Sequence, residues 1–140
     1  MRDYVIFTDS SCDITPELLA EWEVPFVSLS YKFDEDAASH GNFDLPFPEF
    51  YDRMRKGSVA RTAAANMDTF KQAFEPFLQE GKDILYIGFS SGLSTTVNSG
   101  AMAAKVSSTR IFRSGYSSMS SLAAMAPELT VVLRPEEKPM

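Results

Sequence analysis

The stretch Ile84–Thr96 constrains the fold more than any other part of the sequence. Its apolar start, Ile84–Ile87, is too short for a helix and runs directly into a loop of glycines and hydroxyl side chains, after which the pattern becomes helical. Strand, loop and helix N-terminus are therefore predicted to follow one another. A helix N-terminus presents about four unpaired N–H groups and roughly half a positive charge, so this junction favours a polar or anionic ligand.

The same loop allows two other interpretations. Its hydroxyl groups, on Ser90, Ser91, Ser94 and Thr95, could simply cap the helix and satisfy the turn. The run Gly88–Gly92 also matches the G-x-S-x-G motif of serine hydrolases, with Ser90 as nucleophile. That mechanism needs a histidine later in the chain, but the only histidine, His40, lies upstream. We expect a binding protein with no catalytic residue, and keep a serine hydrolase as the alternative.

A second strand, loop and helix are predicted at the N-terminus. Tyr4–Thr8 is typical of a buried strand, and the polar run Asp9–Asp13 follows it. Thr15 and Pro16 then suit the N-cap and the first position of a helix. The aspartates of the loop could bind a metal, although they more often form turns, and we expect no metal site. Cys12 could be a reactive nucleophile, but a spectator thiol is the simpler interpretation.

The next fifty residues alternate between apolar and polar segments. Phe26–Tyr31 is predicted to be one strand, and the polar excursion Asp34–Asn42 is expected at the surface, with His40 solvated. Phe47–Lys56 has aromatic residues spaced four apart, which predicts a helix with its aromatics in the core. Gly57 is placed to end that helix.

One more helix completes the pattern before the strand at Ile84. Asn66 can cap it, its apolar residues follow the spacing of an amphipathic face, Pro76 should kink it, and Gly81 ends it. The order of elements predicts an α/β fold: a mostly parallel sheet with flanking helices. Ligands on such sheets bind beyond the carboxyl ends of the strands, where the Asp9–Asp13 and glycine loops both lie.

Composition excludes several classes of protein. The 140 residues carry a net charge of −6 and scattered basic residues, which argues against nucleic-acid binding. No apolar run approaches the ~20 residues of a membrane span, and no signal-peptide pattern opens the chain, so we expect a cytoplasmic protein. A single cysteine excludes an internal disulfide framework.

Three stretches resemble the DegV family of fatty-acid-binding proteins: Phe7–Ile14, Arg61-Thr62 and Gly88–Thr96. The resemblance extends over Asp3–Lys105. It implies a long-chain fatty acid as ligand, no cofactor, and an acyl tunnel between an N-terminal and a C-terminal domain. Members of the fatty-acid-kinase type present the carboxylate to a partner kinase.

By this resemblance the carboxylate would be bound by Thr62 and by hydroxyls of the glycine loop, namely Ser91, its neighbour Ser90, and Ser94. Such bonds are chemically reasonable, because charge-assisted hydrogen bonds from hydroxyls and helix amides are the strong class. The chain departs from the family pattern at Ala63-Ala64, where Ser-Gln or similar is usual, and at Thr95, where glycine is common.

The resemblance stops before the end of the chain. We expect a DegV-type N-terminal domain in residues 1–112, an atypical tail in 113–140, and no second domain, so that binding would be impaired by truncation. Arg113–Ser117 can be encoded so that the frame one base later reads Val-Val-Asp-Thr, which the family shows after Ile-Phe. We therefore hypothesise that the tail comes from a frameshift, which the DNA sequence of the gene would test.

Overall fold

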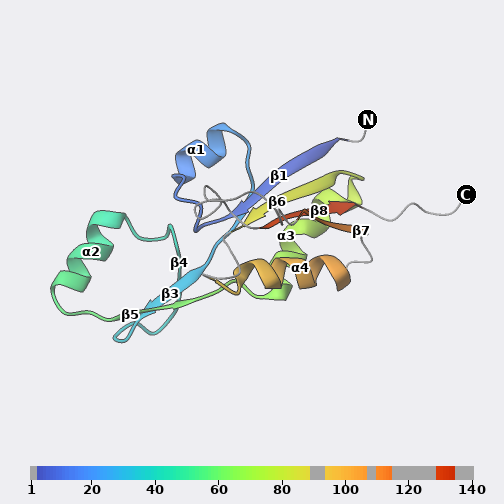
Figure 1. Cartoon of the computed structure of the whole chain (residues 1–140). Coiled ribbons are helices and arrows are strands. Elements are labelled where there is room, and N and C mark those ends of the chain that lie inside the picture. The colour runs from blue at the N-terminus through green and yellow to red at the C-terminus, as the bar shows by residue number, and fades with distance from the viewer. Residues whose placement is uncertain (1–2, 89–93, 107–109, 115–128, 135–140) are drawn as a thin grey trace, which may run out of the picture.

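The computed structural model describes residues 3–88, 94–106, 110–114 and 129–134, the last two ranges as backbone strands. Figure 1 shows a main sheet with helices α3 and α4 on one side of it, and an arm that extends to one side of this body. The main sheet has the strand order β2-β1-β6-β8-β7, and the arm is built on a three-stranded sheet of order β4-β3-β5. The elements, in chain order, are β1 (Tyr4–Asp9), α1 (Pro16–Glu21), β2 (Phe26–Val27), β3 (Ser30–Phe33), β4 (His40–Gly41), α2 (Phe47–Arg55), β5 (Ala60–Ala63), α3 (Met67–Gln79), β6 (Asp83–Gly88), α4 (Thr96–Val106), β7 (Arg110–Ser114) and β8 (Leu129–Arg134).

The first half of the main sheet is parallel, as predicted. Strand β1 pairs in parallel with β2 on one side and with β6 on the other, so the carboxyl ends of all three meet at one edge. The predicted α/β class, with a mostly parallel sheet and flanking helices, is confirmed for this part of the chain. Strands β8 and β7 then join antiparallel beyond β6.

Strand β8 is not among the elements that the sequence predicts. Its residues, LTVVLR, include an apolar and β-branched run that suits a strand. Strand β7 spans the expected boundary after residue 112, and β8 lies between β6 and β7. The division into residues 1–112 and 113–140 stays a prediction.

Local signals at the helix ends are confirmed. The Thr15 side chain accepts a hydrogen bond from the Leu18 N–H, and Asn66 Oδ1 accepts one from the Thr69 N–H at 2.9 Å, so both residues are the N-caps that the sequence indicated. Gly57 and Gly81 have φ values of 102° and 78°, which glycine adopts most easily. The helices α2 and α3 therefore end where the sequence predicted.

The segment Phe26–Tyr31 is not one strand. Phe26–Val27 pairs with β1 in the main sheet, whereas Ser30–Phe33 leaves it and pairs with β4 and β5 in the arm. The chain changes sheets at Ser28 and Leu29, where the Leu29 N–H donates to Ser10 Oγ at 2.9 Å. This bond ties the start of the arm to the carboxyl end of β1.

The core lies between the main sheet and the helices α3 and α4. Tyr86 is fully buried and its ring packs against Phe70 of α3, with centroids 5.1 Å apart. Two glycines make room for Tyr86: a Cβ on Gly88 would lie 2.5 Å from the tyrosine hydroxyl, and one on Gly100 would lie 3.0 Å from its ring. Gly88 is therefore explained by the packing of Tyr86 rather than by a close approach of ligand to backbone.

A buried hydrogen bond joins the ends of β1 and β6. The Tyr86 hydroxyl donates to Asp9 Oδ2 at 2.5 Å, and Asp9 is 1% exposed. Asp9 also accepts hydrogen bonds from the N–H and the hydroxyl of Ser11. Burial, followed by the nearby Asp9 carboxylate, raises the pKa of Tyr86 well above its usual range, so the phenol stays protonated and donates.

Replacing Tyr86 by phenylalanine should lower the free energy of unfolding by about 1–3 kcal/mol, because the buried Asp9 carboxylate then loses its phenol donor. Urea denaturation of the two proteins measures the difference. Tyr4→Phe is the matched control, since Tyr4 is 65% exposed and should tolerate the change. Equal losses in both variants would contradict a special role for the Tyr86–Asp9 bond.

Candidate functional site

A cavity of about 280 Å³ lies where the carboxyl end of β1 faces the arm. One wall is formed by the loop after β1 and the other by the segment that leads into and through α2. Its lining residues are Ser10, Asp13, Ile14, Thr15, Tyr31, Asn42, Phe43, Leu45, Phe47, Phe50 and Tyr51. The cavity therefore combines polar groups from the β1 loop with aromatic rings from the arm.

The polar wall is held by backbone and side-chain hydrogen bonds. Asn42 Nδ2 donates to the Ser10 carbonyl at 3.1 Å, and the Asn42 N–H donates to Ser28 Oγ at 2.9 Å. Ser10 is 5% exposed and its hydroxyl accepts from Leu29 N–H, as described above. The two walls are thus joined across the base of the arm. Asp13 has a φ of 58°, a left-handed conformation that aspartate tolerates in turns.

The aromatics of α2 are not core residues, contrary to the expectation from their spacing. Phe47, Tyr51 and Met54 are 48%, 53% and 43% exposed, and no residue of this helix is buried. The helix has an amphipathic pattern because one side of it faces the cavity and the arm. A four-residue spacing of aromatics cannot distinguish a helix on a core from a helix over a cavity.

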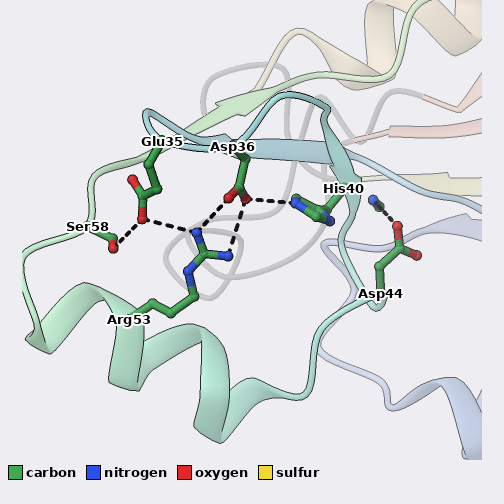
Figure 2. A network of polar contacts seen from close by, with 7 residues as sticks. Glu35, Asp36, His40, Asp44, Arg53 and Ser58 are labelled. Carbon is green, nitrogen blue, oxygen red and sulfur yellow. Dashed lines mark hydrogen bonds and ion pairs between the residues drawn. The ribbon is translucent and has the colours of Figure 1, made fainter.

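A cluster of charged residues fastens α2 to the arm (Figure 2). Arg53 donates to Asp36 at 2.7 and 3.2 Å and to Glu35 at 3.0 Å. Its guanidinium also lies 3.9 Å from the centroid of the Phe33 ring. The Arg53 hydrogen bond lowers the pKa of Asp36, so the pair remains ionised at neutral pH. We call these contacts of Arg53 with Glu35, Asp36 and Phe33 the α2 clasp.

His40 is not the solvated loop residue that the sequence suggested. It lies in β4, its Nε2 is 2.8 Å from Asp36 Oδ2, and its ring stacks on Tyr31 with centroids 5.4 Å apart. Asp36 thus contacts both Arg53 and His40. This arrangement gives His40 a structural place beside the α2 clasp.

The structure describes two of the four predicted carboxylate ligands. Thr62 lies in β5, exposed, directly opposite Tyr31 of β3 in the antiparallel register. Opposed residues share one face of a sheet, so Thr62 is on the same face as a residue that lines the cavity. Ser94 precedes α4, where its hydroxyl accepts from the Thr96 N–H at 3.2 Å and donates to Thr96 Oγ1 at 2.9 Å. Ser90 and Ser91 lie outside the described residues.

Tyr31 and Asn42 line the cavity with Ser10, although the sequence indicates only a strand end at Tyr31 and the end of a surface excursion at Asn42. Nothing in the spacing of these residues predicts the cavity. Among the described residues, no group of three or more histidine, cysteine, aspartate or glutamate side chains could hold a metal ion. In the same part of the chain no helix is long and apolar enough to cross a membrane.

Replacing Arg53 by glutamine should release α2 while leaving the main sheet intact. The expected result is faster amide hydrogen exchange in residues 47–55, because the helix buries none of its own residues and loses its charged contacts. Arg61→Gln is the matched control, since Arg61 forms an ion pair with Asp34 in the same arm without involving α2. Exchange rates in α2 that match between the variants and the original protein would rule out the clasp.

Both a family model and a sequence relative of this chain belong to one protein family. A family model described as "Uncharacterised protein, DegV family" matches residues 3–130. A DegV domain-containing protein of Clostridium perfringens, CPE0026, is 33% identical over 104 residues, which are 74% of this chain and 36% of that protein.

Solved structures show the same similarity. A stearic-acid-binding protein of Eubacterium ventriosum superposes with a TM-score of 0.66 at 25% identity, over 74% of this chain and 36% of its own. A DegV family protein of Thermus thermophilus, described by its fatty acid binding, gives a TM-score of 0.66 at 25% identity, over 76% of this chain and 38% of its own. The chain therefore spans little more than a third of the length of these relatives.

Proposed function

This chain belongs to the DegV family, and we propose that it binds a long-chain fatty acid, with part of the acyl chain in the cavity between the β1 loop and α2. The observation that carries the proposal is the cavity itself, with its aromatic wall of Phe43, Phe47 and Phe50. Each methylene that leaves water for such a surface contributes about 0.8 kcal/mol. Relatives described by their fatty acid binding support the same ligand.

The size of the cavity limits how much of the ligand it can hold. Its volume of about 280 Å³ lies just below the range for small-molecule sites, which is roughly 300–1,000 Å³. The cavity would therefore cover one section of a long acyl chain, and other parts of a full-length family member would cover the rest. Affinity of this chain alone should be lower than that of such a protein.

The carboxylate would lie at Thr62 and the glycine loop, with hydroxyls from Ser91, Ser90 and Ser94 as further donors. What supports this placement is the register that puts Thr62 opposite Tyr31, because a ligand passing along that face can reach both Thr62 and the cavity. The exposed position of Thr62 would leave the carboxylate accessible to a second protein. Presentation to a fatty acid kinase is proposed on this basis and on the resemblance to the family.

Replacing Thr62 or Ser91 by alanine should weaken the binding of stearate by about 1–3 kcal/mol, the range for hydrogen bonds to a charged group. Isothermal titration of each variant measures the change. Ser39→Ala is the control, because Ser39 is an exposed serine in the connection between β3 and β4. If the original chain binds stearate and neither variant differs from it, the placement of the carboxylate is wrong.

The proposal contains no catalytic step, and the serine hydrolase alternative has its own test. A fluorophosphonate probe labels an activated serine covalently, so a hydrolase would be labelled at Ser90. The substitution Ser90→Ala would abolish this labelling. We expect no labelling in a chain that binds stearate. Labelling at Ser90 would replace the proposed function with the hydrolase.

A further inference from the structure

The lining of the cavity carries charge of one sign. Among the described residues that line it, Asp13 is the one charged residue, and the others have apolar, aromatic, hydroxyl or amide side chains. No lysine, arginine or histidine belongs to this described lining. The cavity wall therefore contains a carboxylate without a cationic side chain to balance it.

The Asp13 side chain is exposed and unpaired. In the part of the chain that the structure describes, no hydrogen bond or ion pair joins it to another residue. Two nearby aspartates differ in this respect, since Asp44 accepts from the Gly41 N–H at 2.6 Å and Asp36 accepts from Arg53 at 2.7 Å. The charge of Asp13 is thus left for solvent or a ligand to balance.

The helix that follows Asp13 does not reverse the charge of this wall. Thr15, which also lines the cavity, is the N-cap of α1, so the positive end of that helix lies in the same wall. However, α1 has only six residues and carries Glu17 in its first turn. The two carboxylates of Asp13 and Glu17 exceed the roughly half a positive charge of a helix end. The wall formed by the β1 loop is therefore negative.

A fatty acid carboxylate meets different conditions inside the cavity and at Thr62. Like charges repel more strongly beside apolar surface than in bulk water, because the effective dielectric constant is lower there. Inside the cavity the carboxylate would meet Asp13 and aromatic rings such as Phe47 and Tyr51, and aromatic faces attract cations rather than anions. Thr62 lies outside the described lining and offers a hydroxyl. The carboxylate is thus favoured outside the cavity.

We propose that Asp13 fixes the direction in which a fatty acid lies, so that the acyl chain enters the cavity and the carboxylate stays outside it, on the side of Thr62. The inference rests on the proposed function, because it assigns the acyl chain to the cavity. It makes Asp13 a residue that determines specificity. An amphiphile with a quaternary ammonium head should lie the other way round, with its head beside Asp13 and the aromatic rings.

Two substitutions isolate the charge of Asp13. Asp13→Asn removes the charge at almost constant size, and asparagine, like aspartate, tolerates the left-handed conformation that Asp13 adopts with a φ of 58°. The fold should therefore be retained. Glu17→Gln is the matched control, because it changes the net charge equally from an exposed position outside the described lining of the cavity.

Intermolecular NOEs report the direction of the ligand. The probes are dodecanoate and dodecyltrimethylammonium, which share one chain length, each added below its micelle concentration to isotope-labelled protein. In the original chain the terminal methyl group of dodecanoate should give stronger NOEs to the rings of Phe43 and Phe47 than the methylene next to its carboxylate does. The N-methyl groups of the cation should give such NOEs instead. Asp13→Asn should strengthen the NOEs from the methylene next to the carboxylate, and Glu17→Gln should keep the original pattern.

Isothermal titration supplies a second readout. Asp13→Asn should weaken the binding of the cation roughly twofold to fivefold, the range for one exposed charge pair, and leave dodecanoate bound at least as tightly. Glu17→Gln should change both affinities less.

Three results would overturn parts of this account. Stronger NOEs from the carboxylate end than from the methyl end in the original chain overturn the direction of the ligand. An unchanged NOE pattern in Asp13→Asn overturns the role of Asp13, and both of these results leave fatty acid binding intact. Failure of dodecanoate and stearate to bind overturns the proposed function and this inference together.

Discussion

The hydrogen bond from Tyr86 to Asp9 is the contact on which the site depends. It is buried, it joins the ends of β1 and β6, and it fixes the point at which the β1 loop begins. Ser10 follows immediately and holds the start of the arm through Leu29 and Asn42. The position of one cavity wall relative to the other thus depends on the buried carboxylate of Asp9. The contacts of Asp9 in the structure are with Tyr86 and Ser11.

In contrast to the buried Tyr86–Asp9 contact, helix α2 of the arm is held mainly by contacts at the surface. Helix α2 buries none of its residues. Its contacts with the arm include the α2 clasp, the packing of Phe50 on Tyr31 and Phe33, and the packing of Phe47 on Phe43. Segments that bury little apolar surface open at low free-energy cost, and ligand-binding elements are commonly of this kind. A weakly held helix with exposed aromatics over a cavity suits a site whose ligand is itself long and apolar. In the proposed complex the main sheet would position the polar end of the ligand, and the arm would contact its acyl chain.

Much of this fold could be predicted from local signals, because caps, helix-ending glycines and apolar strands act over a few residues. Thr15, Asn66, Gly57 and Gly81 are placed as the sequence indicated. The division of Phe26–Phe33 between two sheets could not be predicted, since the bond from Leu29 to Ser10 that marks the change is a tertiary contact. The same limit explains the exposed α2 aromatics: periodicity identifies an apolar face but not what covers it. The carboxylate ligands in the glycine loop remain predictions.

If this chain binds a fatty acid as proposed, the acyl chain occupies the cavity between the β1 loop and α2. Amide NMR of the full chain during a titration with stearate, kept below its micelle concentration, tests this most directly. We expect the largest chemical-shift changes in residues 10–15 and 42–51 and at Thr62, with little change at Tyr4 and Ile6 on the exposed side of β1. Saturable changes that fall at Tyr4 and Ile6 and leave residues 42–51 unaffected would contradict it.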